Sequence, residues 1–405
     1  MVLFVRERCF KLHRLMFTIL GLWPYQNSCI WRLQAVFFFS VYSSFLIFQL
    51  TTFLTSTCNI DCIFKKFSYI CITIAYITNY YSFYFNSETV KQSLEHIQLD
   101  WKMLETSETI KIFEEYLFEA YILALSAYIT LIVGSFVLIS FESTSVILDA
   151  FIPINESRPR KLEVDFELFV DQEEYFFLYL IQEMLGVGIG MCSVIATGTF
   201  LATIGKHCCA TYKIASYLIQ NTVTIHTLQL PAPQRMQIMH RSICLSVHIH
   251  RRTMQFCKRI LISFHFWYFP LLIIGVLSLS CVLFRLYNAI MQFNDFYEIL
   301  ISCLLLYCYL IYMFVGNFIA HSYSEHSGRV LEAMYDTLWY VAPLPIQKLF
   351  LIMQKSIQNH KLVMGGLFVL SIEGFSTLIT SAVSYFTVMH AMNDHDTEGR
   401  LVKKI

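Results

Sequence analysis

The chain has 405 residues, of which 56% are hydrophobic and 14% charged, and its formal net charge is zero. A soluble domain needs about a quarter of its residues charged to cover its surface, so this composition excludes an ordinary soluble protein and indicates one embedded in a lipid bilayer. Zero net charge, without a basic tract interleaved with aromatic residues, also excludes nucleic acid as a partner.

The amino-terminal residues 1–32 carry five basic residues but no long apolar core and no small-residue cleavage site, so we expect a cytoplasmic segment and not a cleaved signal peptide. Seven apolar stretches follow, each long enough to cross about 30 Å of hydrocarbon as a helix. They are 33–55, 67–85, 117–141, 175–204, 260–290, 296–321 and 366–392. The second is the weakest, because Thr73, Thr78 and Asn79 dilute it. The predicted fold class is all-α integral membrane.

The distribution of lysine and arginine predicts the orientation, because basic connectors stay in the cytoplasm. The side that holds the amino terminus has 20 of the 29 basic residues, and the other side has nine. We therefore expect a cytoplasmic amino terminus and an extracellular carboxyl terminus. The segments are then 1–32 inside, helices one to four in 33–204, a cytoplasmic extension at 205–259, helices five and six in 260–321, a second cytoplasmic segment at 322–365, helix seven at 366–392 and an outer tail at 393–405.

Two features of the predicted outer loops bear on this orientation. The one glycosylation sequon, Asn155-Glu156-Ser157, falls in a loop that the charge count places outside, where glycans are attached. Cys58 and Cys62 lie in the first outer loop, where they form either a disulfide bridge or two free thiols.

The cytoplasmic segments have helical patterns of their own. In 205–259, apolar residues recur every three or four positions on both sides of Pro231, which predicts that two membrane helices continue into the cytoplasm as a hairpin. Its apolar stripes need a partner surface, either another subunit in an anchor region or the rest of the same chain. In 322–365 a second stripe ends at Pro343, and a short helix at about 346–358 leads through Gly365-Gly366 into the last span.

One stripe of modest polarity runs along the last helix. It comprises Ser381, Ser384, Val388 and Ala391. An apolar side chain on such a stripe can gate a pore by dewetting, although small residues also serve tight helix packing. Glu373 is expected roughly 10 Å into this helix. A carboxylate at that depth either faces a cation vestibule or reaches back to the cytoplasmic interface.

Other polar residues favour structural interpretations. Glu183 and His265 are expected to be buried and to pair with neighbouring hydroxyl groups. His248 and His250 do not share a helix face, and Cys208-Cys209 is adjacent to neither, so we expect solvated residues and no metal site. No nucleophile elbow, phosphate-binding loop or zinc-protease motif occurs, so we expect neither an enzyme nor a cofactor.

Several motifs resemble those of insect odorant receptors over nearly the whole chain. They are Gly21-Leu22-Trp23-Pro24, the loop 153–159, the entry 171–175 to the fourth helix, and a carboxyl-terminal signature of Ala333, Tyr335, Trp339, Tyr340, Gln347-Lys348 and Ser384-Tyr385-Phe386-Thr387-Val388. The tail 393–405 is longer and more charged than is usual in that family.

This resemblance implies a ligand-gated, nonselective cation channel in the plasma membrane of sensory neuron dendrites. It implies a hetero-tetramer of an odorant-tuned subunit and a common co-receptor, in which the last helix lines the pore and Val388 is at the gate. The cytoplasmic ends of the later helices then form the anchor between subunits, and a small apolar odorant binds in the outer half of the bundle.

Depth in the membrane is the only guide to the residues of that odorant pocket. Outer-half candidates on helices two to six are Tyr69, Thr73, Phe136, Met184, Met191, Leu283, Tyr287 and Tyr307. Such aromatic and thioether side chains suit a volatile ligand that binds by apolar burial, although each also suits helix packing. The alternatives are a heptahelical receptor that signals through a G protein, which needs an outer amino terminus, and a transporter, which needs internal repeats.

Overall fold

The computed structural model describes residues 2–55, 60–103, 107–144, 151, 162–293, 296–356 and 361–402. Its elements in these ranges are mostly long helices. They are α1 (Val2–Ile19), α2 (Ser28–Thr55), α3 (Ile60–Phe85), α4 (Ser87–Lys102), α5 (Ser107–Glu142), α7 (Phe176–Gln220), α8 (Ile225–Gln229), α9 (Ala232–Asn288), the π-helix η1 (Ala289–Phe293), α10 (Phe296–Tyr335), the 3-10 turn η2 (Trp339–Val341), α11 (Leu344–Ser356), strands β1 (Val363–Met364) and β2 (Phe368–Val369), and α12 (Ile372–Val402).

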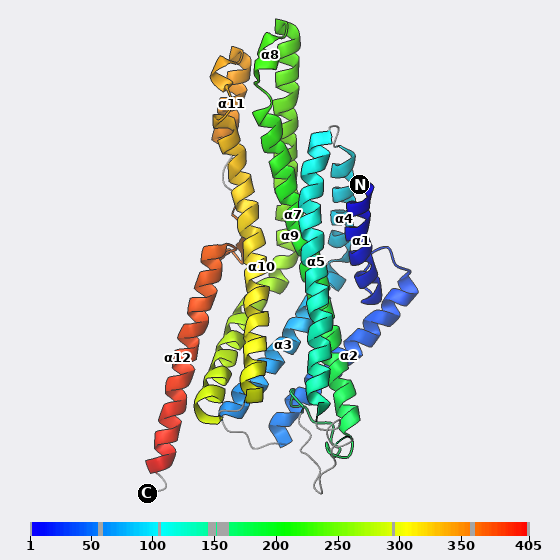
Figure 1. Cartoon of the computed structure of the whole chain (residues 1–405), viewed down its shortest axis with the longest axis vertical. Helices are drawn as coiled ribbons and strands as arrows, with labels where there is room; N and C mark the ends of the chain where they lie inside the picture. The colour runs from blue at the N-terminus through cyan, green and yellow to red at the C-terminus, as the bar shows by residue number, and fades with distance from the viewer. Residues whose placement is uncertain are drawn as a thin grey trace.

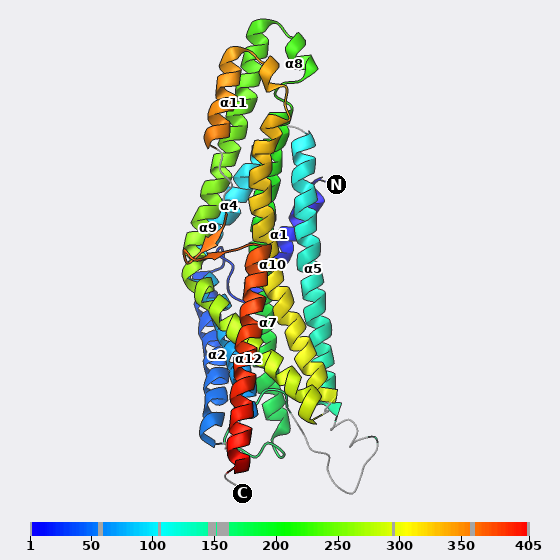
Figure 2. The same ribbon diagram turned by 90° about the vertical axis from the view of Figure 1, so that its left-hand side faces the viewer.

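The long helices form an elongated bundle whose two ends differ. In both views α8 and α11 lie at one end of the long axis and the carboxyl terminus lies at the other (Figure 1, Figure 2). The predicted segments 205–259 and 322–365 therefore share one end of the molecule. We refer to this as the α8–α11 end, and α1 and α4 lie on the same half of the bundle (Figure 1).

All seven predicted spans fall mainly in helices, and the protein is an all-α integral membrane protein. Among the described residues, five helical stretches are long and apolar enough to cross a bilayer: Cys29–Thr55, Ser107–Glu142, Phe176–Gln220, Ala232–Met291 and Phe296–Tyr335. The helices α3 and α12 are more polar. Lys65 and Lys66 lie near the start of α3, and hydroxyl residues recur along α12, so these two spans remain predictions.

The predicted start of the last span at 366 is wrong. The segment from Val363 to Val369 is a small antiparallel hairpin, in which Val363 pairs with Val369 and Met364 with Phe368. The tight turn needs a positive φ at Gly365 (61°) and Gly366 (74°), which glycine adopts without steric strain. The helix begins only at Ile372, so Glu373 lies in its first turn and not about 10 Å inside it.

The helical hairpin predicted for 205–259 is present, and its cytoplasmic location stays a prediction. The helix α7 continues to Gln220, α8 forms a short cap, and α9 starts directly after Pro231. Apolar residues of both arms, including Ile214, Met239 and Ile243, are buried in the main hydrophobic core of this one chain. Packing within the chain thus accounts for those residues. The same core also contains Ile346 and Phe350 of α11.

Candidate functional site

The exposed face of α12 carries a row of hydroxyl groups. Ser376, Thr377, Thr380, Ser381, Ser384 and Tyr385 line an open groove of about 400 Å³. The hydroxyls of Thr377, Thr380, Ser381 and Ser384 each donate a hydrogen bond to the backbone carbonyl four residues earlier, at 2.8–3.0 Å. Because those protons are used within the helix, the oxygen lone pairs are the groups left for a passing ion or water.

The predicted gate stripe lies along this same side of α12. Ser384 and Ala391 are exposed and Ser381 is half-buried, while Val388, near the middle of the helix, exposes 56% of its surface. A residue that served tight helix packing within this chain would be buried, so packing does not account for Val388. Glu373 is also exposed, at the start of the helix.

The opposite face of α12 packs against α9 and α10. Leu378 and Ala382 are buried there with Leu279 and Met313. The hydroxyl of Ser280 on α9 donates to the carbonyl of Ala382 at 2.9 Å. Thus α12 has one apolar, packed face and one exposed face rich in hydroxyl groups. It lies along one side of the bundle and is not in its centre (Figure 1).

The eight predicted ligand residues do not converge on one cavity. Tyr69 and Thr73 are buried inside the bundle, but Phe136 and Tyr307 point outward, with 72% and 55% of their surface exposed. Met184, Met191, Leu283 and Tyr287 are half-buried. The odorant pocket predicted from depth therefore remains a prediction, and Phe136 and Tyr307 are unsuited to an enclosed site within this chain.

Thr73 and Tyr287 have partners on other helices that the sequence could not name. Thr73 donates to the side-chain oxygen of Gln49 on α2 at 2.9 Å. Tyr287 on α9 packs edge-to-face on the rings of Phe386 and His390 of α12, with ring centroids 6.0 and 4.7 Å apart. Thr73 therefore ties α3 to α2, and Tyr287 ties α9 to the outer part of α12.

An asparagine at the centre of the bundle joins several helices. Asn79, which dilutes the second predicted span, is buried, and its side-chain oxygen accepts hydrogen bonds from Tyr268 on α9 at 3.1 Å and Tyr312 on α10 at 3.4 Å. Thr197 on α7 donates to the same oxygen at 3.4 Å. Asn79 was noted from the sequence only as a polar residue in a weak span, so its role as a shared acceptor was missed.

A buried ion-pair cluster lies where the start of α3, the end of α9 and the start of α10 meet. The guanidinium of Arg285 binds Glu163 at 2.6 Å and Glu298 at 2.5 Å, and it donates to the hydroxyl of Tyr69 at 2.5 Å. Tyr69 in turn donates to Glu163. Lys65 binds Glu298 at 3.0 Å. Tyr69 therefore uses its hydroxyl inside this cluster, which weakens its prediction as an odorant contact.

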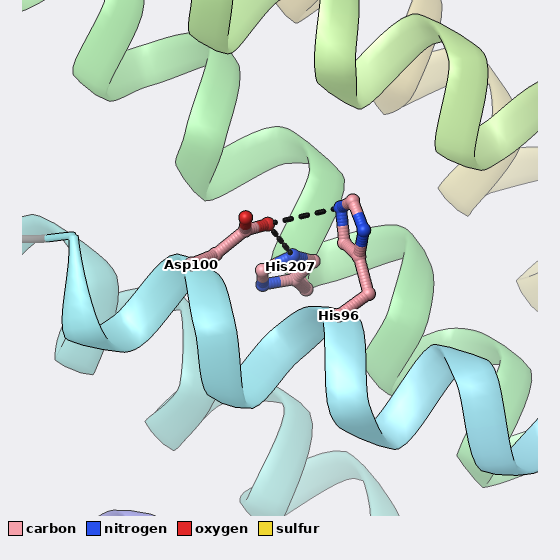
Figure 3. Close-up of side chains that lie close together, drawn as sticks. All are labelled: His96, Asp100 and His207. Carbon is pink, nitrogen blue, oxygen red and sulfur yellow. Dashed lines mark hydrogen bonds and ion pairs between the residues drawn. The ribbon is translucent and has the colours of Figure 1, made fainter.

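On the half of the bundle that includes the α8–α11 end, the side chain of Asp100 links three helices. The Oδ2 atom of Asp100 on α4 lies 3.0 Å from Nε2 of His207 on α7 and 3.1 Å from Nε2 of His96, one turn earlier on α4 (Figure 3). Nε of Arg252 on α9 donates to Oδ1 of Asp100 at 2.7 Å. Burial alone raises the pKa of the Asp100 carboxyl, but His207 and His96 outweigh it and hold that pKa well below its ordinary value.

The remaining predicted polar sites have mixed outcomes. Glu183 is buried as expected, although its partner is a backbone N–H, that of Val164 at 3.0 Å, and not a hydroxyl. The expected burial of His265 is wrong, because this residue lies on the exposed face of α9 and its Nδ1 is 2.9 Å from the carbonyl of Ile262. Cys208, Cys209 and His250 are all buried, so the expectation that they are solvated is wrong.

The two outer-loop features are only partly described. Cys62 is disulfide-bonded, which favours the bridged alternative, but Cys58 lies outside the described residues. Asn155 also lies outside them, so its glycosylation stays a prediction.

Comparison with known proteins identifies the family. A family model described as 7tm odorant receptor matches residues 49–383. No curated protein matches the chain. Among solved structures, the insect olfactory receptor OR5 from Machilis hrabei in complex with eugenol has a TM-score of 0.74 at 13% identity, covering 96% of this chain and 99% of that one. Another structure of the same receptor has a TM-score of 0.72 at 14% identity, covering 96% and 98%.

Proposed function

The chain belongs to the 7tm odorant receptor family, and on this premise we propose that it is the tuning subunit of a ligand-gated, nonselective cation channel. It opens when a small apolar or volatile ligand binds, and it works as a hetero-tetramer with a co-receptor in the plasma membrane of a sensory neuron dendrite. The amino terminus is cytoplasmic and the carboxyl terminus extracellular. The protein is a receptor and not an enzyme.

One observation carries the proposal, and it is the hydroxyl-lined groove on the exposed face of α12. A membrane helix with one packed face and one exposed face of serines and threonines suits a water-filled pore shared between subunits. The hydroxyl protons of Thr380 and Ser384 are held by the helix backbone, so the pore presents oxygen lone pairs. Such a surface favours cations over anions.

The gate is a ring of Val388 side chains from the subunits. Val388 is exposed, lies one turn beyond Ser384 on the same side of α12, and is apolar. Ions cross such a constriction only when it widens enough to hold water. At the start of the helix, Glu373 is exposed and forms part of a cation vestibule.

The anchor between subunits lies at the α8–α11 end, in the segments 205–259 and 322–365. Ile346 and Phe350 bury one face of α11 in the chain's own core, but Leu344, Leu351 and Ile352 are exposed on the same helix. Exposed large apolar residues on a helix outside the bilayer indicate a protein partner. A neighbouring subunit or the co-receptor covers them.

The ligand is a small apolar molecule with few polar groups. The related receptor from Machilis hrabei was solved with eugenol, a compound of this kind. The interior of the present bundle offers aromatic rings together with a few hydroxyl and amide groups, such as Tyr268, Tyr312 and Asn79. Apolar burial at about 25 cal/mol per Å² then supplies most of the affinity, and hydrogen bonds supply selectivity.

Electrophysiology on cells that express this subunit with the family's co-receptor tests the proposal. We expect odorant-evoked cation currents that cells with the co-receptor alone do not give. The absence of such currents across a broad odour panel, despite expression at the cell surface, contradicts the assignment.

Cysteine scanning tests the pore face directly. We expect a charged thiol reagent to reduce the evoked current of Ser384→Cys. Ser126→Cys on α5 is the matched control, because Ser126 is exposed on a membrane helix and its hydroxyl also bonds a backbone carbonyl of its own helix. If both variants or neither respond, α12 does not line the pore.

A further inference from the structure

The aspartate that joins α4, α7 and α9 has two histidine nitrogens converging on one of its oxygens (Figure 3). The ligand atoms of His96, Asp100 and His207 all lie within 4.8 Å of one another. Imidazole nitrogens and a carboxylate oxygen are ligands that Zn²⁺ and similar transition metals prefer. His96 and Asp100 are four residues apart on α4, so they share one helix face, and His207 approaches that face from α7.

The spacing suits hydrogen bonds and lies within a few tenths of an ångström of that around a metal ion. Around a tetrahedral ion with bonds of about 2.0–2.1 Å, neighbouring ligand atoms are separated by about 3.3 Å. The two observed nitrogen-to-oxygen distances are 3.0 and 3.1 Å. Within the described part of the chain, Nε2 of His96 is buried without a hydrogen-bond partner despite its short distance to Asp100. In the tautomer that has its proton on Nδ1, this nitrogen can bind an ion that lies between the three side chains.

Both imidazole rings are fixed by aromatic neighbours. The ring of His96 stacks on Phe256 of α9, with centroids 4.0 Å apart and planes 4° apart. His207 meets Phe113 and Phe256 edge-on, with centroids 5.2 and 5.9 Å apart. Ligands held in one orientation lose little freedom when a metal binds.

A small cavity next to Asp100, which neither histidine lines, has room for a water molecule. This cavity has a volume of about 30 Å³ and is lined by Thr211, Thr253 and Arg252. This is about the volume of one water molecule. Arg252 binds Oδ1 of Asp100, so it orients the carboxylate and leaves Oδ2 facing the histidines. Because the guanidinium also repels a dication, we expect micromolar and not tighter affinity.

We propose that His96, Asp100 and His207 bind a transition-metal ion of the Zn²⁺ class, which ties α4 to α7 on the α8–α11 half of the receptor. This site is separate from the pore face of α12 and does not depend on channel activity. Without a metal, the same residues form only an ion-pair hub centred on Asp100. The two descriptions differ in whether the histidines are needed for metal uptake.

Spectroscopic titration of the purified full-length chain distinguishes them. After treatment with a chelator, the protein is titrated with Co²⁺, which gives visible absorption bands when bound in a tetrahedral site. We expect one equivalent to bind, Zn²⁺ to displace it, and Zn²⁺ to raise the thermal unfolding midpoint. His96→Gln and His207→Gln should bind at least about tenfold more weakly and lose the absorption bands.

His248→Gln is the matched control, because His248 is an exposed histidine of α9 and should leave the titration unchanged. His96 is half-buried on the short helix α4, so His96→Gln decides the question even if His207→Gln fails to fold. The proposal is overturned if the wild-type chain takes up no Co²⁺ at micromolar concentration. It is overturned equally if His96→Gln binds as tightly as the wild type.

Discussion

Replacing Arg285 with alanine tests how far the outer ion-pair cluster holds the bundle together. The Arg285 side chain is only 6% exposed and neutralises Glu163, which is 7% exposed, as well as Glu298. Its removal leaves a buried carboxylate without its cation. Breaking a buried pair in this way costs about 3–5 kcal/mol. At about 2 °C per kcal/mol for a large domain, the unfolding midpoint should fall by about 6–10 °C.

Thermal unfolding of the detergent-purified receptor measures this effect. Arg329→Ala is the matched control, since Arg329 pairs with Glu325 at 2.6 Å on the surface, where both side chains are about half exposed. Loss of that pair should cost less than about 1 kcal/mol. Adding Glu163→Gln to Arg285→Ala should recover part of the lost stability, because it removes the stranded charge. A midpoint for Arg285→Ala that matches Arg329→Ala refutes the reasoning.

Three further substitutions give separate tests. Gly190→Ala should destabilise the receptor by about 1–3 kcal/mol, because its Cβ would lie 2.1 Å from the buried ring of Tyr76, whereas Gly188→Ala, with no atom within 4 Å, should not. Burial lowers the pKa of His13 to about 4, so the folded state keeps this ring neutral while the unfolded state takes up a proton below about pH 6.5. The free energy of unfolding should therefore fall by about 2 kcal/mol between pH 7 and pH 5. In melting curves recorded at several pH values, His13→Asn should remove this pH dependence. Glu373→Gln should lower single-channel cation conductance, and an unchanged conductance contradicts the vestibule.

Helix positions were predictable because hydrocarbon thickness leaves few options for an apolar stretch of about 20 residues. The helical hairpin in 205–259 was also predictable, because Pro231 separates two segments in which apolar residues recur every three or four positions. The hairpin before α12 was not predictable. Its strands are two residues each, too short to show alternation, and Gly365-Gly366 indicated only that the chain breaks there.

Depth in the membrane was a poor guide to the side chains that face inward. In α3, polar residues such as Thr73 and Asn79 are buried, so polarity marks the inner face of that helix. In the long apolar stretches of α5 and α10, buried and exposed positions alike carry apolar residues, because lipid and protein both favour them. Such helices have no periodicity to show which face is buried, so the sequence did not indicate that Phe136 and Tyr307 are exposed in this chain.

The contacts of α12 restrict how an odorant can act on the proposed gate. A ligand shifts a conformational equilibrium only by its different affinity for the two states, so it must act on helices that contact the pore helix. Among the described residues, α12 packs mainly against α9 and α10. Tyr287 of α9 packs on Phe386 and His390, which flank Val388 along α12. Its predicted role as a ligand contact is therefore better replaced by a role in coupling. We expect Tyr287→Ala to reduce the maximal current more than the apparent odorant affinity, and an effect on affinity alone would return Tyr287 to the pocket.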